Sequence, residues 1–237
     1  GPQYDPEAIL TQAHFALAHL HPENITQRTA VTRDLGMAYH YQGNREAASR
    51  AYREAILLSE QSGNSFINML AATGLGIILE SQLALGEAGN WFERVVQLAG
   101  NPPTPTACEA YLGLARLAYE QNKLDDCEQL AQQALALAQQ IEGIDSVASC
   151  QMVLAKRRAA QQDFAGAKLL LNEAAHFLTQ QAFPEALMKV ADLRVWLLLQ
   201  QGETETALQL AQSSGSPLGQ ARALLANGQL QAARTLA

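Results

Sequence analysis

A spacing pattern recurs along this chain of 237 residues, with a period of about 40. Each copy starts at a turn residue, and small or apolar residues follow five, nine and twelve positions later. The clearest copies are Gly43 with Ala48, Tyr52 and Ala55; Asn122 with Cys127, Ala131 and Ala134; Gln162 with Ala167, Leu171 and Ala174; and Gly202 with Ala207, Ala211 and Ser214. Self-similarity of this kind predicts a solenoid, in which each unit leaves an apolar face for its neighbour to cover.

Two further copies are imperfect. One has Ala88 and Phe92 at the small and apolar positions but Leu83 at the turn position, so we expect its turn to be displaced toward Gly86. The other is short and pairs Gly228 with Ala233.

Composition favours helices throughout. The chain is 48% apolar but only 6% aromatic, and it is rich in Ala, Leu and Gln, which are good helix formers. No long β-branched run competes for strand formation. We therefore predict one elongated all-α domain over residues 3–237, built from about five to six helix hairpins.

The first hairpin carries a recognisable motif. Leu35-Gly36 and Tyr39, followed by Ala48, Tyr52 and Ala55, resemble the L-G-x-x-Y…A…F…A skeleton of the tetratricopeptide repeat. The resemblance implies a tetratricopeptide-like superhelical solenoid, with a period near 40 instead of the usual 34 or so. This longer period, together with residues 51–79 and 102–135, is similar to the helical sensor region of the large ATP-binding, LuxR-type, MalT-like transcription activators. The likeness covers residues 25–211.

That resemblance implies a larger parent protein, in which the sensor accompanies an amino-terminal nucleotide-binding module and a carboxy-terminal DNA-binding helix-turn-helix. It implies that the sensor accepts an inducer, after which the ATP-bound chain self-associates and activates transcription. This sequence has neither a G-x-x-x-x-G-K-[ST] phosphate loop nor a separate basic helix-turn-helix. Gly1-Pro2 looks like the remnant of a cleaved purification tag. We expect an excised sensor fragment whose partners include the missing modules.

Charge and cysteine usage restrict the setting. A net charge of −7 argues against non-specific attraction to nucleic acid, and we expect the basic cluster Lys156-Arg157-Arg158 on a solvated helix face. No signal peptide is visible, and the longest uncharged apolar stretch, residues 66–79, is too short to cross a bilayer. The three cysteines lack C-x-x-C spacing, and Cys127 occupies a small-residue repeat position, so we expect buried thiols in a reducing cytosol.

No group of residues predicts catalysis, a metal site or a cofactor, so we expect a protein that is not an enzyme. His19 and His21 lack a third and fourth ligand at useful spacing, and they are expected to be exposed near a helix end. Asp125-Asp126 begins a predicted helix, where acids complement the macrodipole. Gly74-Leu75-Gly76 lacks the third glycine and the preceding strand of a dinucleotide loop, which favours packing glycines. Trp91 is expected to precede an outer helix and to anchor packing.

The resemblance also implies where a partner would bind, because the first helix of each tetratricopeptide hairpin lines a concave groove. Leu35-Gly36 sets the register. The residues expected to face the groove are Arg33, Met37, His40, Tyr41, Thr73, Ile77, Leu112, Arg116, Tyr119, Met152, Lys156, Asp192, Trp196 and Gln200, with Glu80, Glu120 and Lys189 beside them. Aromatics, Met and charges of both signs could stack on a sugar or heterocycle, or hold a short peptide.

Packing offers a second interpretation for part of this set. The apolar members that fit equally well between adjacent helices are Met37, Ile77, Leu112 and Met152. Arg33 and Arg116 could instead form ion pairs with acids such as Asp34 or Glu120. Trp196 and Tyr119 are the stronger groove candidates, because a large aromatic residue facing a groove needs a reason.

Two functions remain open. The first is a sensing domain of a transcription activator, which binds a small-molecule or peptide/protein inducer and controls self-association and DNA binding of the full-length protein. The second is a tetratricopeptide scaffold that docks peptides without sensing. Self-association through the carboxy-terminal end is a further expected contact, since Leu224, Leu225, Leu230 and Leu236 need cover there.

Overall fold

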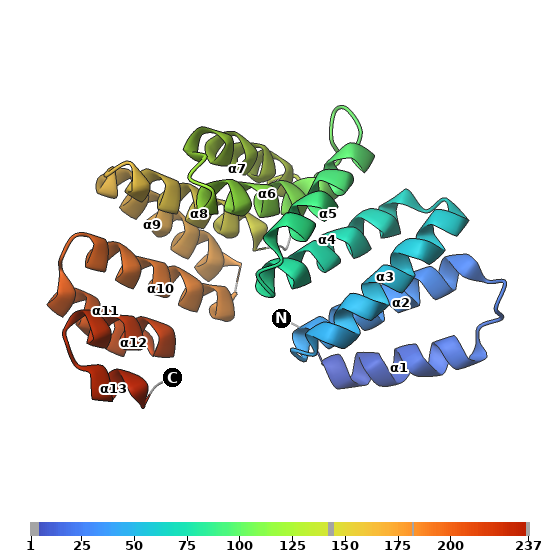
Figure 1. Cartoon of the computed structure of the whole chain (residues 1–237), viewed down its shortest axis with the longest axis horizontal. Helices are drawn as coiled ribbons and strands as arrows, with labels where there is room; N and C mark the ends of the chain where they lie inside the picture. The colour runs from blue at the N-terminus through green and yellow to red at the C-terminus, as the bar shows by residue number, and fades with distance from the viewer. Residues whose placement is uncertain (1–4, 142–144, 182, 236–237) are drawn as a thin grey trace. The chain divides into compact units, whose positions relative to one another are not determined.

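The computed structural model describes residues 5–141, 145–181 and 183–235 (Figure 1). Over those ranges the chain forms thirteen α-helices and one short 3-10 helix, and no strand. The expected tag remnant, Gly1-Pro2, and the expected apolar end residue Leu236 lie outside the described residues. The helices group into two compact units, residues 1–123 (unit 1) and 124–237 (unit 2). The single domain over residues 3–237 stays a prediction.

Unit 1 is a series of antiparallel helices, each packed on the next. Its elements are α1 (Pro6–His19), α2 (Ile25–Tyr41), α3 (Arg45–Ser62), α4 (Ser65–Ser81), α5 (Leu85–Leu98), the 3-10 helix η1 (Pro105–Ala107) and α6 (Cys108–Glu120). The pairs α2/α3 and α4/α5 are hairpins, and α2 also packs on α4, as α4 does on α6. The first helices of successive hairpins are therefore neighbours, as tetratricopeptide-like stacking requires.

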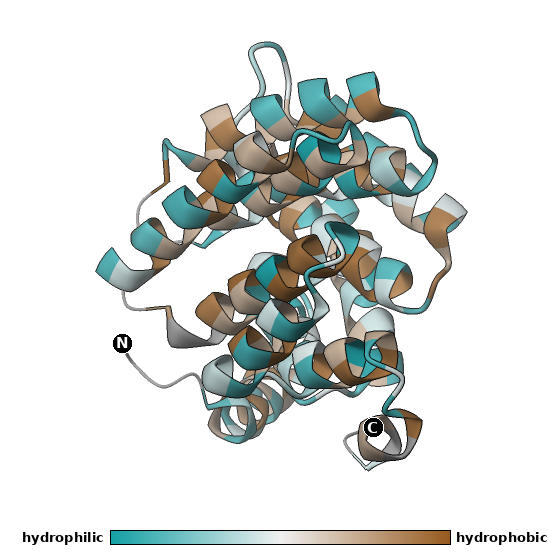
Figure 2. Ribbon diagram, turned by 90° about the vertical axis from the view of Figure 1, so that its left-hand side faces the viewer, coloured by the Kyte–Doolittle hydropathy of each residue, from teal (hydrophilic) through white to brown (hydrophobic). Residues whose placement is uncertain are grey.

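Unit 2 repeats this order. Its helices are α7 (Leu124–Ala138), α8 (Ser146–Ala160), α9 (Phe164–Gln180), α10 (Pro184–Gln200), α11 (Thr204–Ser214), α12 (Pro217–Ala226) and α13 (Leu230–Arg234). Helix α10 contacts both α8 and α12, while α8/α9, α10/α11 and α12/α13 form the hairpins. Figure 2 shows hydrophilic and hydrophobic residues alternating along most helices, as expected where one stripe of a helix is buried. None of the helices in the described ranges combines the length and the apolar character that crossing a membrane requires.

Short polar side chains set the helix starts. Asn24, Asn44 and Asn64 each accept a hydrogen bond from the backbone N–H three residues later, at the beginnings of α2, α3 and α4. Asp163 and Ser216 do the same for α9 and α12. Such caps satisfy amides that have no partner inside the helix.

The turn positions of the repeat share a left-handed backbone. Gly43, Gly202 and Gly228 have positive φ, and so do Asn122 and Gln162. Leu83 also has a φ of 62°, so the expected shift of this turn toward Gly86 is wrong. The turn closes at Leu83, whose N–H donates to Glu80 O at 3.0 Å while Ala84 N–H donates to Leu79 O at 2.9 Å. These two bonds hold leucine in a conformation that costs an L-residue about 1–2 kcal/mol.

The small and apolar repeat positions are confirmed as the packing core. Fully buried members are Ala48, Ala55, Ala88, Phe92, Cys127, Ala131, Ala134, Ala167, Leu171, Ala174, Ala207 and Ala211, while Tyr52 is 4% exposed. Small side chains at these positions let neighbouring helices approach closely.

Glycines on the first helices receive the two largest of these core side chains. A Cβ added at Gly36 would lie 2.6 Å from the ring of Tyr52, and one at Gly113 would lie 2.5 Å from the ring of Phe92. Gly74 faces Tyr52 and Gly76 faces Phe92 in the same way. The expectation that Gly74-Leu75-Gly76 is a packing feature is confirmed.

Candidate recognition surface

The predicted site residues of unit 1 lie on three first helices. Helix α2 carries Arg33, Met37, His40 and Tyr41; α4 carries Thr73 and Ile77; α6 carries Leu112, Arg116 and Tyr119. Because α2 packs on α4 and α4 on α6, the three helices form one continuous face of unit 1. We call this the first-helix face.

On α2, Arg33 is engaged by its neighbours. Its Nη1 lies 2.9 Å from Asp34 Oδ1 and 3.9 Å from the sulfur of Met37, whereas its Nε is buried without a partner. The ion pair with Asp34 was one of the two interpretations of Arg33 and is confirmed. Burial raises the pKa of Asp34, and the adjacent guanidinium of Arg33 opposes that shift.

The end of α2 is aromatic. The rings of His40 and Tyr41 are stacked with centroids 5.9 Å apart, and Tyr41 is 65% exposed. Burial lowers the pKa of His40, and the positive charge of Arg45 lowers it further. His40 is thus biased toward its neutral form.

Helices α4 and α6 are joined by a bidentate ion pair. Arg116 donates from Nε and Nη2 to the two carboxylate oxygens of Glu80, both at 2.7 Å. Side chains in the pair are 31% and 21% exposed, so both charges are largely withdrawn from water. The expected ion pair of Arg116 is therefore present, but its acid is Glu80 on the preceding first helix and not Glu120.

Two of the predicted residues of unit 1 lie in the packing instead of at the surface. Leu112 is 1% exposed and Thr73 is 7% exposed, with its hydroxyl buried and unpartnered. A side chain this deeply buried is not presented to a ligand, so we leave both out of the proposed surface. Ile77 and Tyr119 are partly buried.

In unit 2, Met152 and Trp196 contact the same group of buried residues. Both are partly buried and pack against one apolar cluster formed by α8, α9 and α10. Asp192 accepts a hydrogen bond from the hydroxyl of Ser216, which caps α12, so it serves helix packing. Lys156 is partly buried, whereas Gln200 and Lys189, both on α10, are exposed.

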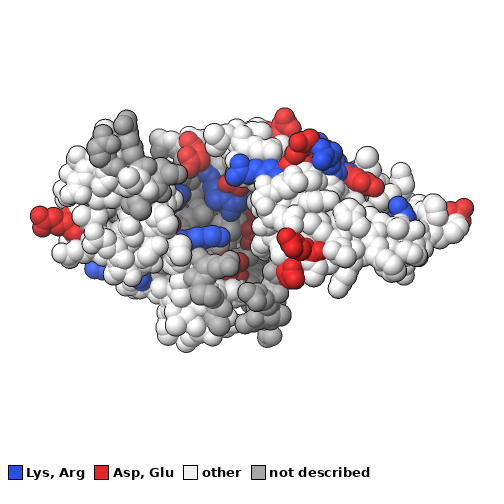
Figure 3. Space-filling view, turned by 90° about the horizontal axis from the view of Figure 1, so that it is seen from below, with Lys and Arg blue, Asp and Glu red and all other residues white. Residues whose placement is uncertain are grey.

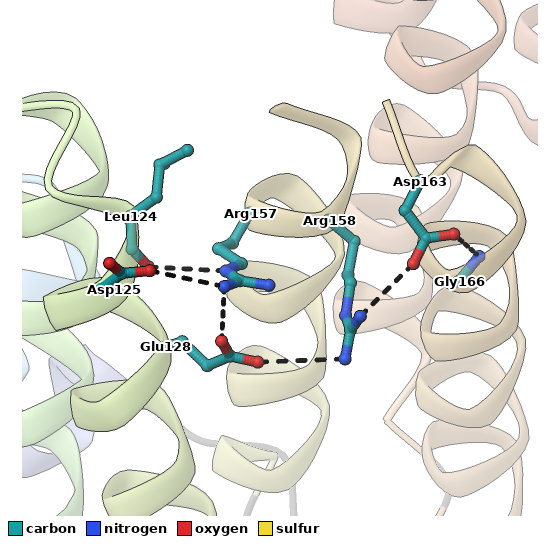
Figure 4. Close-up of polar contacts among 7 residues, drawn as sticks. All are labelled: Leu124, Asp125, Glu128, Arg157, Arg158, Asp163 and Gly166. Carbon is teal, nitrogen blue, oxygen red and sulfur yellow. Dashed lines mark hydrogen bonds and ion pairs between the residues drawn. The ribbon is translucent and has the colours of Figure 1, made fainter. Parts of the chain in front are cut away.

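The basic cluster at the end of α8 differs from expectation. The side chain of Arg157 is 8% exposed and lies 2.5 Å from Glu128 and 3.8 Å from Asp125, both on α7 (Figure 4). Its Nε donates to the carbonyl of Leu124 at 3.5 Å. The solvated-face interpretation is therefore wrong for Arg157, because three acceptors from α7 accompany its charge into the interior.

Arg158 extends the same network toward α9. It is 45% exposed and lies 3.9 Å from Glu128 and 3.4 Å from Asp163, whose other oxygen caps α9 (Figure 4). The sequence did carry a signal for Arg157: Cys150, Leu154 and Arg157 follow i, i+4, i+7 spacing, which places all three on one stripe of α8. The charge of Arg157 alone predicts a solvent-exposed side chain, whereas its spacing from Cys150 and Leu154 indicates a buried one.

The cysteines behave as predicted. Cys108, Cys127 and Cys150 are buried, and their sulfurs are not joined in disulfides. Burial raises the pKa of Cys127 to about 11, and nearby Arg157 opposes that shift. A thiol in this state is a poor nucleophile at neutral pH.

The other polar candidates occupy ordinary structural positions. His19 ends α1, with Nδ1 2.8 Å from Phe15 O, and the side chain of His21 is 74% exposed. Asp125-Asp126 occupies the first turn of α7, as predicted. Trp91 lies inside α5 instead of preceding it, with the guanidinium of Arg94 5.3 Å from its ring centroid. Across the described ranges, no three His, Cys, Asp or Glu residues are grouped as a metal site would need.

On the face seen in Figure 3, charges of both signs are interspersed among uncharged residues.

Comparisons with known proteins agree with this architecture. A family model described as "MalT-like TPR region" matches residues 2–237. BtubC (BKLC) from P. vanneervenii is similar in structure, with a TM-score of 0.62 and 15% identity over 99% of this chain and 89% of that one. The apo form of RapI has a TM-score of 0.68 and 11% identity, covering 96% of this chain and 86% of that one. A Rap protein complexed with Competence and Sporulation Factor has a TM-score of 0.73 and 11% identity, over 94% and 66% of the two chains. Among curated proteins no match was found.

Proposed function

The chain belongs to the MalT-like TPR family, and on that premise we propose that it is the sensing domain of a transcription activator. The domain binds an inducer on its surface, and that binding controls self-association and DNA binding of the full-length protein. It acts by recognition and not by catalysis.

One observation carries the choice of surface. The first-helix face of unit 1 holds two partly buried arginines, Arg33 on α2 and Arg116 on α6, which form ion pairs with Asp34 and Glu80. The side chains of Arg33 and Arg116 are still 24% and 31% exposed, so a ligand can reach their guanidinium groups from solvent. A ligand oxygen that accepts a charge-assisted hydrogen bond from either group would gain about 1.5–3 kcal/mol. We therefore propose that this face contacts the polar groups of the inducer, with Tyr41 and His40 offering an aromatic surface beside them.

The energy needed for sensing is small. To bias the parent protein tenfold toward its active state, an inducer must bind that state about 1.4 kcal/mol more tightly than the inactive one. One charge-assisted hydrogen bond made in only one of the two states supplies about that much.

A peptide-docking scaffold is the second candidate. The specific observation in its favour is the structural similarity to a Rap protein solved with Competence and Sporulation Factor. The chaperone type of scaffold, which clasps a carboxylate with Lys and Asn pairs, is disfavoured because Arg33 and Met37 on α2, and Thr73 and Ile77 on α4, occupy the comparable positions.

Calorimetric titration separates these functions. A panel of sugars and nucleosides and a panel of short peptides are each titrated into the wild-type chain, Arg33→Gln, Arg116→Gln and the control Arg50→Gln, which lies exposed on α3. Saturable heat from a small molecule that is lost in the first two variants and kept in the control supports the proposal. Saturation with peptides alone supports the scaffold. Binding that is unchanged in both Arg33→Gln and Arg116→Gln refutes the proposed surface.

We further propose a cytosolic setting, in keeping with the three buried cysteines, which form no disulfide. Self-association through the carboxy-terminal end is also proposed, because Leu225 and Leu230 are 52% and 51% exposed. If that end mediates dimerisation, the double variant Leu225→Gln, Leu230→Gln will lower the mass measured by light scattering at high concentration. An unchanged mass would remove this contact from the proposal. The parent chain's nucleotide-binding and DNA-binding modules are the other proposed partners.

A further inference from the structure

Unit 2 contains a pocket that lies over α10 and between α9 and α11. Its volume is about 400 Å³. The floor is apolar: Leu197 is 5% exposed, and Leu198 and Leu210 are partly buried. Sites for small molecules typically fall between about 300 and 1,000 Å³ and combine an apolar floor with a few fixed polar groups. This pocket has both properties.

The polar groups include two positive charges. Arg194 on α10 donates from Nη2 to Asn172 Oδ1 at 2.8 Å and to Leu171 O at 3.3 Å. Both acceptors are neutral, so these bonds orient the guanidinium without compensating its charge. Lys168, which lies one turn before Asn172 on α9, lines the same pocket.

These two cations differ from the arginines described above. Arg33, Arg116 and Arg157 each lie within ion-pair distance of a carboxylate. Within the described part of the chain, no ion pair involves Lys168 or Arg194. The pocket therefore has a positive side, on which neither cation lies within ion-pair distance of a described acid, although Glu203 also lines the pocket.

We propose that this pocket binds a small molecule that carries one anionic group, a carboxylate or a phosphate, on an apolar body. The anionic group binds Arg194 and Lys168, where a charge-assisted hydrogen bond forms with a guanidinium already held in place. The apolar body covers Leu197, Leu198 and Leu210. Glu203, which also lines the pocket, repels a second anionic group, so the site selects molecules with a single negative end.

This pocket is separate from the first-helix face of unit 1. Its polar residues come from α9, α10, α11 and the connection between α10 and α11, and none of them belongs to the surface proposed for the inducer. If no ligand binds in this pocket, the proposed inducer surface on unit 1 is unaffected. If the inducer surface fails its test, the proposal for this pocket is unaffected.

Methyl NMR of leucine-labelled protein tests the proposal, with octanoate, octyl phosphate and octan-1-ol as probes. Octanoate or octyl phosphate should give saturable shifts centred on Leu197, Leu198 and Leu210. Octan-1-ol should bind about tenfold more weakly, because it lacks the charge that pairs with Arg194. Comparison of the two anions distinguishes a carboxylate site from a phosphate site. Equal affinity for octan-1-ol, or no saturable shift with either anion, overturns the proposal.

Variants identify the residues responsible. Lys168→Gln and Arg194→Gln should each weaken binding of the preferred anion about tenfold. Lys189→Gln is the matched control, since this exposed lysine lies on α10 outside the pocket lining. Lys168 is itself exposed, so its variant keeps the test valid if Arg194→Gln fails to fold by circular dichroism. Equal loss in Lys168→Gln and Lys189→Gln would indicate non-specific attraction and refute the site.

Discussion

Replacing Arg157 tests whether the charged cluster between α7 and α8 stabilises unit 2. The substitution Arg157→Met keeps the length of the side chain but removes its charge. It leaves Glu128 without its closest cation, which lies 2.5 Å away, and removes the hydrogen bond that Arg157 Nε donates to the carbonyl of Leu124. We expect the free energy of unfolding to fall.

The magnitude follows from burial. Breaking a fully buried ion pair by removing one partner costs about 3–5 kcal/mol. The side chain of Glu128 is 25% exposed, so water recovers part of that cost and we expect a loss of about 2–3 kcal/mol. Asp125 adds little to this figure because it is 92% exposed and lies 3.8 Å away.

Urea unfolding followed by far-UV circular dichroism measures the loss. Arg158→Met is the matched control: Arg158 is 45% exposed, so its ion pairs are solvated and its replacement should cost less than about 1 kcal/mol. The double variant Arg157→Met, Glu128→Leu should recover much of the stability, since an apolar pair can replace a buried ion pair at little cost.

The reasoning would be refuted in either of two ways. Arg157→Met and Arg158→Met could have equal effects, or Arg157→Met could lose less than about 0.5 kcal/mol, which is typical of surface positions. A double variant that is no more stable than Arg157→Met would show that the loss comes from packing and not from the stranded carboxylate of Glu128.

Three further predictions concern turns, glycines and the buried thiol. Gly113→Ala should destabilise the chain by about 1–2 kcal/mol in urea unfolding, because the new Cβ meets the ring of Phe92 at 2.5 Å, whereas Gly89→Ala, with its nearest atom at 3.4 Å, should not. Leu83→Gly should raise the melting temperature by removing left-handed strain of about 1 kcal/mol; a lower melting temperature would contradict this. Because the pKa of Cys127 is raised from 9.0 to about 11, the thiol stabilises the fold fully below pH 9, and this contribution is lost as pH rises from 9 toward 11. Urea unfolding across that range should show the decline in the wild-type chain and a smaller one in Cys127→Ala.

The sequence predicted the helical order well because the repeat positions are set by packing. Residues such as Ala48, Ala131 and Ala174 are small since two helices cross there, and that requirement recurs at a fixed interval. The left-handed turn residues were equally visible when they were Gly or Asn, which reach that conformation easily. Leu83 was misjudged because its conformation is imposed by the hydrogen bonds around it and not by its own preference.

The candidate site was less predictable. Register on a helix says which residues share a face, but it does not say how deep each one lies. The register therefore assigns Thr73 to the groove and leaves Leu112 open between groove and packing, although both are buried. The ion-pair partner of a long charged side chain can come from a neighbouring helix, and the sequence does not show which residues two helices bring together. The sequence therefore does not identify Glu80 as the partner of Arg116. The resemblance does not predict the pocket around Arg194, because second helices contribute to its walls, whereas the resemblance implies binding on first helices.

The seating of Tyr52 and Phe92 has a practical consequence for dissecting this chain. Each ring lies against one glycine of its own hairpin, Gly36 or Gly76, and against another on the following first helix, Gly74 or Gly113. A boundary drawn between successive hairpins therefore strips one wall from an aromatic side chain, even though it cuts only a loop. Fragments of unit 1 intended for separate expression should retain the first helix that follows the last complete hairpin.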